Sequence, residues 1–303
     1  MMYRIGSRKS ALAMYQSERV QGLLAPFTLT AVVGFSTRGD DQSISLSAEG
    51  SAEIFVNALR AALLSQEADL VVHSLKDVPT YAHADITLAA VPERVDAHDV
   101  FVGVDGASID EIPEGSIIGT SSPRRGVWVK QMRPDLEVRP IRGNVETRLQ
   151  KVREGQYAGT ILAAAGLSRL GLLTPEMHEI SFEELTPAPS QAALGVECLS
   201  SNTELLALLS HIDDVTARIC VSAERAVVRT LGASCATAAG AYAEISSDGL
   251  FRLTADVASV ETTEKIRIQV SAAINSVSEA EELGAHVARL LIDDGAHAII
   301  GQQ

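Results

Sequence analysis

The chain has 303 residues, of which 46% are hydrophobic and 4% are aromatic. This length exceeds one ordinary core and fits two or three domains, and a core of aliphatic side chains suits sheets that helices cover on both faces. The formal net charge of -14 repels polyanions at long range, so no nucleic acid partner is expected.

The N-terminal segment has charges at Arg4, Arg8 and Lys9 and no apolar run long enough for a signal peptide. No stretch of the chain approaches the roughly 18 to 20 apolar residues of a membrane span. We therefore expect a soluble, cytoplasmic protein with no membrane partner.

The three cysteines, Cys198, Cys220 and Cys235, are widely spaced and form no CxxC pair. Their number and spacing argue against a disulfide framework and against a zinc site, so no metal is expected. Cys198 and Cys220 lie in apolar segments and are interpreted as small core residues. Cys235 differs, because its neighbours in LGASCATAAG are very small and leave space for another group.

Short apolar strands alternate with helical patterns in two successive parts of the chain, which predicts parallel or mixed sheets with crossover helices. In the first part, the expected strands are 3–6, 29–36 and 68–74, and the expected helices are 10–25 and 52–66. In the second part, the segments of the same character are 116–122, 123–132, 136–141, 144–155, 159–166 and 167–171.

The segment 186–198 has two prolines and then an apolar strand, which is typical of a hinge that returns the chain to the first sheet. From about residue 217 the pattern becomes that of a small antiparallel α+β domain. Its expected elements are a helix at 218–231, strands at 239–246, 250–259 and 265–274 with a hairpin turn at 247–249, and a final helix that ends at Gly295. The expected domains are 1–97 with 190–214 (α/β), 98–189 (α/β) and 215–303 (α+β).

Three predicted helix starts combine a capping side chain with neighbouring arginines, an arrangement that favours anion binding. They are Ser10 with Arg8, Ser122 with Arg124 and Arg125, and Asn144 with Arg142 and Arg148. Residues 124 to 153 hold nine of the 25 basic residues against three acidic ones, and seven of the nine are arginine. On charge alone, a solvated basic face and a site for a small anionic ligand both remain open.

The stretch ADLVVHSLKDVPT, residues 68 to 80, places polar side chains directly after a buried strand. These side chains are His73, Ser74, Lys76 and Asp77. Because ligands of open α/β sheets bind at the carboxyl ends of strands, this group lies where chemistry is expected. A solvated turn with a helix-capping aspartate is the alternative.

Seven segments in this order and spacing identify a resemblance over nearly the whole chain. They are IGSRKSALAMYQ, STRGDD, ADLVVHSLKDVPT, IGTSSPRR, RGNVETRL, ILAAAGLSRLG and AERAVVRTLGASC. The chain resembles the porphobilinogen deaminase (hydroxymethylbilane synthase) family. The resemblance implies two periplasmic-binding-protein-like α/β domains and a small C-terminal α+β domain with a three-stranded antiparallel sheet. It also implies a monomeric transferase of porphyrin biosynthesis that joins four porphobilinogen molecules head to tail, with loss of ammonia.

The same resemblance assigns roles to individual residues. Cys235 would carry a dipyrromethane cofactor through a thioether, and Asp77 would be the catalytic residue that stabilises cationic pyrrole species. The expected cofactor contacts are Lys76, Asp77, Ser122, Arg124 and Arg125. The expected substrate contacts are Arg8, Ser10, Ser74, Thr120, Arg142, Asn144, Arg148 and Gln191.

The chain departs from the family pattern in three places. The segment Gly50 to Phe55 lacks a lysine and a glycine of a mobile loop, and Ser190 to Ala192 stands where Gly-Gln-Gly is common. Ala233 and Ser234 replace two glycines before the cysteine. We expect an active but divergent enzyme; a paralogue without polymerase activity and a two-lobed binding protein for a small carboxylated ligand are the alternatives. A docking face for protein or phosphate is a third interpretation of the arginines.

Overall fold

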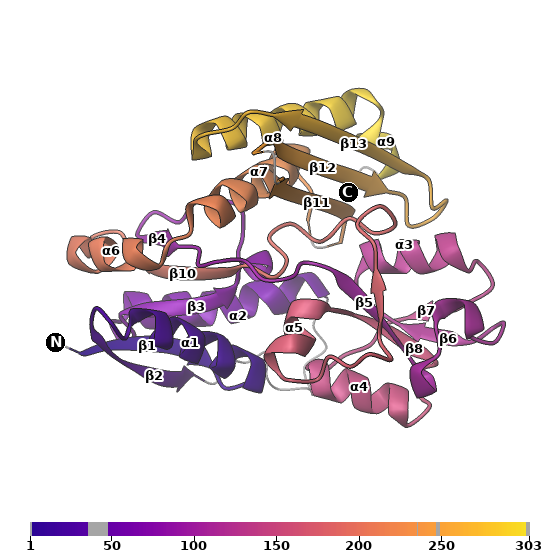
Figure 1. Cartoon of the computed structure of the whole chain (residues 1–303), viewed down its shortest axis with the longest axis horizontal. Helices are drawn as coiled ribbons and strands as arrows, with labels where there is room; N and C mark the ends of the chain where they lie inside the picture. Colours follow the sequence, from indigo (N-terminus) through magenta and orange to yellow (C-terminus); the bar gives the residue numbers. More distant parts are fainter. Residues whose placement is uncertain (1, 36–47, 235, 247–248, 301–303) are drawn as a thin grey trace. The chain divides into compact units, whose positions relative to one another are not determined.

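The computed structural model describes residues 2–35, 48–234, 236–246 and 249–300 (Figure 1). It divides into two compact units. One is Met1–Val95 with Gln191–Ile219, and the other is Asp96–Ser190 with Cys220–Gln303. Among the described residues, no helix combines the length and the apolar character that crossing a membrane requires.

The first unit contains a five-stranded sheet of order β2-β1-β3-β10-β4. Its strands are β1 (Met2–Arg8), β2 (Leu29–Phe35), β3 (Leu70–Ser74), β4 (Ile86–Ala90) and β10 (Leu194–Leu199). Strands β1, β2 and β3 are parallel, whereas β10 runs antiparallel to β3 and β4. The segment after the two prolines therefore does return to the first sheet, as the sequence predicts.

Helices cover both faces of this sheet because side chains along each strand alternate. Leu70 and Val72 pack with α1 (Ala11–Leu24) and α6 (Thr203–Leu209) on one face. Val71 points to the opposite face and packs against α2 (Ala48–Leu64). The two resulting cores pack on the two faces of β3, which is the middle strand of the sheet. The carboxyl end of β3 lies at the end of the sheet where the strand stops.

The second unit contains a sheet of order β7-β6-β8-β5-β9. Its strands are β5 (Asp99–Gly103), β6 (Ile117–Gly119), β7 (Glu137–Arg139), β8 (Gly159–Ala163) and β9 (His178–Ile180). Strand β6 is parallel to β7 and β8, whereas β5 is antiparallel to β8 and β9. Helix α3 (Pro123–Met132) packs with one core of this sheet, and α4 (Val145–Arg153) and α5 (Ala164–Arg169) pack with the other.

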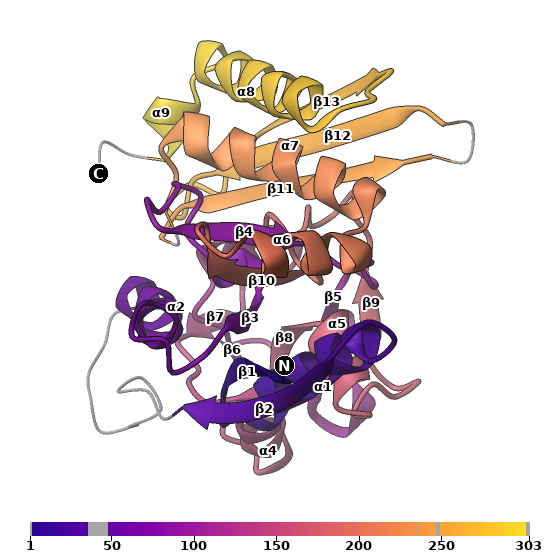
Figure 2. The same ribbon diagram turned by 90° about the vertical axis from the view of Figure 1, so that its left-hand side faces the viewer.

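The C-terminal part of the chain forms a separate antiparallel sheet of order β11-β12-β13. The strands are β11 (Ala238–Ile245), β12 (Phe251–Ala258) and β13 (Lys265–Ala272), and α8 (Val277–Asp293) packs against β12 and β13 (Figure 2). A side chain at Gly284 of α8 would collide with the backbone of Ala223 in α7 (Val215–Leu231), so these two helices need glycine for their close approach.

The predicted α/β fold class is confirmed: the chain has two mixed five-stranded sheets with helices and a three-stranded antiparallel sheet with helices. The helix predicted to end at Gly295 is α8, which ends at Asp293 with Asp294 as its C-cap, but it is not the final helix as predicted, because a further helix follows Gly295. Gly295 adopts a left-handed φ of 99° and begins this short helix, α9 (Ala296–Ile299). The segment Gly50 to Phe55, compared above with a loop, lies within α2. The predicted hairpin turn includes residues 247 and 248, which lie outside the described residues.

Candidate active site

The carboxyl end of β3 continues into one turn of 3-10 helix, Leu75–Asp77, which carries the polar group predicted from the sequence. Leu75 and Val78 are buried, and the backbone N–H of Leu75 donates to the carbonyl oxygen of Ala193 at 3.0 Å. Lys76 and Asp77 between them are exposed. The turn is therefore anchored by its apolar residues and carries two consecutive exposed side chains of opposite charge.

Gln191 lies beside this turn and is fully buried. Its Oε1 accepts a hydrogen bond from Nζ of Lys76 at 3.2 Å, and its carbonyl oxygen accepts one from Nε of Arg94 at 2.8 Å. The flanking residues Ser190 and Ala192 adopt φ angles of 63° and 70°. Both positions thus have the left-handed backbone that favours glycine, as the comparison with Gly-Gln-Gly predicts.

The end of β1 contributes to the same edge of the first sheet. Arg8 places its guanidinium 3.3 Å from the ring centroid of Phe55, which is a cation–π contact. Ser10 is the N-cap of α1, with its hydroxyl accepting from the backbone N–H of Ala13. Gln16 of α1 donates to Oγ of Ser74 at 2.8 Å, so the start of α1 and the end of β3 are joined.

A second group of predicted residues occupies the corresponding edge of the second sheet. Ser122 caps α3 and Asn144 caps α4, and their side-chain oxygens accept from the backbone N–H groups three residues on. Thr120 is buried, and its Oγ1 accepts from the backbone N–H of Ser122 at 3.1 Å. Ser121 Oγ donates to the carbonyl oxygen of Ile141 at 3.0 Å and joins the two helix starts.

The arginines of this second group differ in burial. Arg142 is exposed, and Arg148 is half-buried with its Nε donating to the carbonyl oxygen of Gly143 at 2.9 Å. Arg124 and Arg125 are both only 7% exposed. The first pair lies beside the N-terminus of α4, whereas the second pair belongs to a buried network.

Asp99 is the centre of that buried network, and the sequence analysis missed it. Its Oδ2 lies 2.7 Å from Nη1 of Arg124, and its Oδ1 lies 2.6 Å from Nη2 of Arg125. Burial by itself raises the pKa of Asp99, but the two guanidinium groups outweigh burial and hold the pKa well below its usual range. A ligand carboxylate that binds Arg124 or Arg125 must therefore share these side chains with Asp99. The sequence signal was an aspartate at the start of an apolar strand.

Cys235 lies outside the described residues, but its neighbours are described. Ser234 is exposed and Ala236 is half-buried. The backbone N–H of Ser234 donates to Oγ1 of Thr237, and that of Ala236 donates to Oγ of Ser234. The loop on either side of the cysteine is thus a tight turn of small residues with exposed members.

The other two cysteines, Cys198 and Cys220, are buried. Burial, with a smaller effect of the charge on Glu197, raises the pKa of Cys198 to about 11. Its thiol is therefore a poor nucleophile near neutral pH. The interpretation of Cys198 and Cys220 as core residues is confirmed by their burial.

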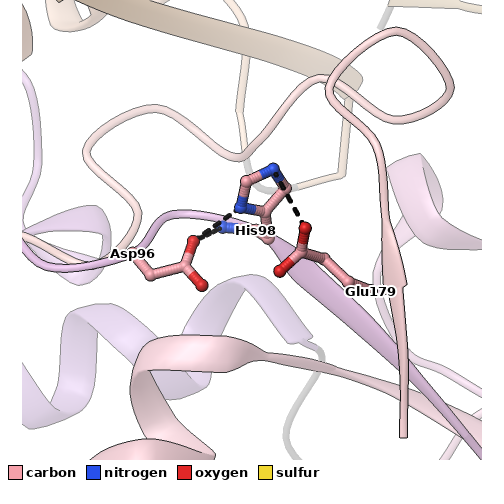
Figure 3. Close-up of side chains that lie close together, drawn as sticks. All are labelled: Asp96, His98 and Glu179. Carbon is pink, nitrogen blue, oxygen red and sulfur yellow. Dashed lines mark hydrogen bonds and ion pairs between the residues drawn. The ribbon is translucent and has the colours of Figure 1, made fainter.

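Asp96, His98 and Glu179 form the group of histidine and carboxylate side chains that comes nearest to a metal-binding arrangement in the described part of the chain (Figure 3). Nδ1 of His98 lies 2.6 Å from Asp96 Oδ1, and Nε2 lies 3.7 Å from Glu179 Oε1. The imidazole also stacks on Phe182, with 3.8 Å between ring centroids. Each ring nitrogen of His98 therefore faces a different carboxylate.

Comparison with known proteins places these features in a family. The family model "Porphobilinogen deaminase, dipyromethane cofactor binding domain" matches residues 3–207, and "Porphobilinogen deaminase, C-terminal domain" matches residues 218–293. The porphobilinogen deaminase of Ralstonia nicotianae is 41% identical over 300 residues, which cover 98% of this chain and 90% of the relative. That of Thiobacillus denitrificans is 42% identical over 300 residues, with 98% and 97% covered.

Among solved structures, the periplasmic VFT2 domain of Bordetella pertussis BvgS matches 70% of this chain and 86% of its own at 14% identity, with a TM-score of 0.40. The family models and the full-length relatives define the class of protein as an enzyme, a transferase with a dipyrromethane cofactor. The chain belongs to the porphobilinogen deaminase family.

Proposed function

We propose that Cys235 carries the dipyrromethane cofactor through a thioether and that Asp77 is the catalytic residue. The activity is that of hydroxymethylbilane synthase, which joins four porphobilinogen molecules head to tail with loss of ammonia. The observation that carries the residue assignment is the turn Leu75–Asp77, in which buried neighbours present Lys76 and Asp77 at the carboxyl end of β3.

The cysteines support the attachment site by exclusion. Thioether formation needs a thiol that the incoming group can reach, and both Cys198 and Cys220 are buried in the apolar cores. Cys235 is the remaining cysteine of the sequence, and the small residues around it leave room for a bound organic group. When bound, the dipyrromethane supplies the pyrrole carbon to which the first substrate is joined.

The cations at the two sheet edges suit a substrate with carboxylates. Porphobilinogen bears an acetate and a propionate, so each added ring brings two negative charges. Arginine remains charged when partly desolvated and binds a carboxylate through two parallel hydrogen bonds. We assign the substrate carboxylates to Arg142 and Arg148 with the N-terminus of α4 at Asn144, and to Arg8 with the N-terminus of α1 at Ser10. Thr120, Ser74 and Gln191 complete the assigned substrate contacts.

The assigned cofactor contacts are Lys76, Asp77, Ser122, Arg124 and Arg125. Lys76 is exposed, and its ammonium group donates to Oε1 of Gln191 at 3.2 Å. Arg124 and Arg125 are held by Asp99, so they can bind a carboxylate without first being ordered. The chemistry of this set, cations and hydroxyl groups, matches a ligand that bears several carboxylates.

Asp77 supplies a negative charge that stabilises the positive charge formed during the reaction. Loss of ammonia leaves positive charge on the pyrrole of the substrate, and a carboxylate oxygen that accepts from the pyrrole N–H stabilises that charge. The same oxygen can take the proton that leaves when the new carbon–carbon bond is formed. An amide at this position would keep the shape and lose both effects.

Two measurements test the assignment. Intact-mass analysis of the purified protein is expected to show an adduct of two porphobilinogens minus two ammonias, absent from Cys235→Ser. Ammonia release from porphobilinogen is expected to fall at least about 100-fold in Asp77→Asn and to stay near wild type in Asp85→Asn, an exposed aspartate on the same connection. An active Asp77→Asn, or an unmodified wild type that binds porphobilinogen without releasing ammonia, would contradict the proposal and favour a binding protein.

We extend the proposal to the organisation of the molecule. The division into 1–97 with 190–214, 98–189 and 215–303 gives each part its own sheet, which supports three domains. We propose a monomer in the cytoplasm that binds neither nucleic acid nor membranes. Light scattering of the purified protein tests the monomer, since a mass near 64 kDa, about twice the 32.1 kDa of the chain, would contradict it.

A further inference from the structure

A buried charged cluster lies within the first unit, on the face of its sheet that α2 covers. Glu197 of β10 is 2% exposed, and its carboxylate accepts from Nε and Nη2 of Arg60 at 3.0 and 2.6 Å. Nε2 of His73 lies 3.2 Å from Oε2 of the same carboxylate. Three elements, α2, β10 and β3, therefore meet at one buried carboxylate.

The register of the sheet explains how His73 reaches Glu197. In the antiparallel ladder, His73 lies opposite Gly195, and Val71 lies opposite Glu197. His73 and Glu197 are therefore diagonal neighbours on the same face, a relationship in which long side chains can touch. Gly195 contributes no side chain to this face, where Leu75 and Leu88 lie beside it.

A buried carboxylate needs an oppositely charged partner that also donates hydrogen bonds. Arg60 meets this need of Glu197, because its guanidinium donates two hydrogen bonds to the carboxylate. Burial by itself would raise the pKa of Glu197, but hydrogen bonds and charges from His73 and Arg60 lower it to about 2. The carboxylate is thus ionised at neutral pH, and the imidazole of His73 faces it across 3.2 Å. The contact of His73 is additional to the pairing that neutralises Glu197.

The position of His73 in the chain gives this additional contact a consequence for the active site. His73 immediately precedes Ser74, the last residue of β3, and the turn with Lys76 and Asp77 follows. Ser74 points to the opposite face and accepts from Gln16 of α1. The end of the strand is therefore held from both faces, by Glu197 on one side and by Gln16 on the other.

We propose that His73, through the 3.2 Å contact of its imidazole with the Glu197 carboxylate, is a positioning residue that sets the orientation of Lys76 and Asp77. This inference rests on the proposed catalytic role of Asp77. His73 is 6% exposed and acts through the backbone that it shares with the turn, without touching substrate. A displacement of a catalytic group by about 1 Å can lower the rate 100-fold.

The test compares His73→Gln with His73→Leu. Glutamine can place an N–H donor near the position of Nε2, whereas leucine fills the space without a donor. For His73→Leu we expect kcat to fall about 10- to 100-fold, with KM within about threefold of wild type, because the substrate carboxylates are assigned to other residues. His73→Gln is expected to retain kcat within about threefold. A folded His73→Leu with wild-type kcat, or a His73→Gln as impaired as His73→Leu, would overturn the inference.

A second variant keeps the test decisive if His73→Leu does not fold. Arg60→Met combined with Glu197→Leu removes both charges together and leaves neither one buried without a partner. In this double variant His73 loses the carboxylate that it contacts, so the same fall in kcat is expected although the imidazole is intact. Unchanged kcat in the folded double variant would overturn the inference.

Asp77→Asn, assayed beside these variants, separates the two proposals. If Asp77→Asn is active, the proposed catalytic role of Asp77 is wrong, and the inference that His73 positions Asp77 for catalysis is wrong with it. If Asp77→Asn is inactive while His73→Leu and the double variant are fully active, the proposed function stands and only the positioning role of His73 is wrong.

Discussion

Asp99 and Arg125 form a buried ion pair in which one carboxylate oxygen accepts two hydrogen bonds, from Nε at 3.1 Å and from Nη2 at 2.6 Å. The other oxygen of Asp99 faces Nη1 of Arg124 at 2.7 Å. Arg124 Nη1 also donates to the carbonyl oxygen of Thr186, and Arg125 Nη1 donates to that of Ile161. A single carboxylate thus holds two arginines in the first turn of α3.

Replacing Asp99 with asparagine is expected to lower both stability and activity. The variant keeps the shape of the side chain but leaves two buried guanidinium groups without their negative partner. Loss of one partner of a buried pair typically costs about 3 to 5 kcal/mol of the free energy of unfolding. Urea unfolding measures this cost, and ammonia release measures the effect on turnover.

Glu137→Gln is the matched control for Asp99→Asn. Glu137 pairs with Arg139 at 2.6 Å, but both side chains are about half exposed. An exposed pair contributes at most about 1 kcal/mol. If Asp99→Asn and Glu137→Gln lost equal amounts of the free energy of unfolding, the burial of Asp99 would not determine the strength of its interactions.

The structure also shows which parts of the site the sequence could predict. The helix starts at Ser10, Ser122 and Asn144 are local signals, since capping depends on side chains within three residues. All three cap their helices as predicted. The turn after β3 was likewise predicted, because a buried strand followed by polar residues is visible within one short stretch.

The buried ion pairs could not be predicted in this way. Asp99 meets arginines that follow it by more than twenty residues, and Glu197 meets Arg60 across most of the first unit. Such pairs depend on strand register and on which helix covers which face, and neither is encoded in local periodicity. The sequence therefore predicted candidate residues that local signals mark, including the buried Arg124 and Arg125, but not the buried carboxylate of Asp99 that pairs with them.

Ser190→Gly is expected to stabilise the protein. Ser190 has a φ of 63°, and its buried hydroxyl has no hydrogen-bond partner among the described residues. In the folded protein, a left-handed backbone costs a residue that has a side chain about 1 to 2 kcal/mol, and glycine removes this cost. Glycine also gives the unfolded chain more conformational freedom, which lowers stability by about 0.4 to 1 kcal/mol. We expect a net gain of about 1 kcal/mol in the free energy of unfolding, measured by urea denaturation.

Ala193→Gly controls for the effect of glycine alone. Ala193 is buried in the same segment but is not among the residues of positive φ. Glycine there should lower stability by about 1 kcal/mol. A loss of stability in Ser190→Gly similar to that in Ala193→Gly would contradict the assigned strain.

The contribution of Glu197 to stability should depend on pH in the acid range. Its pKa is lowered from the usual 4.5 to about 2 in the folded protein, so folding favours the ionised form. The resulting stabilisation is fully present above about pH 4.5 and is lost as the pH falls towards 2; a shift of this size corresponds to on the order of 3 kcal/mol. The free energy of unfolding of the wild type should therefore fall relative to that of Glu197→Gln between pH 5 and about pH 2. A difference that stays constant over this range would show that the carboxylate does not gain its stability from ionisation.

Thiol labelling gives a direct check on the three cysteines. Because burial raises the pKa of Cys198 to about 11 and Cys220 is also buried, neither should react with iodoacetamide at pH 8 in the native protein. In the denatured protein both should react, while Cys235 should stay unlabelled because its sulfur is already part of a thioether. Peptide mass analysis after labelling distinguishes these sites. The outcome that would contradict this assignment is labelling of Cys235 in the denatured form of a wild-type protein that releases ammonia at full rate. The cofactor would then be attached to a different residue.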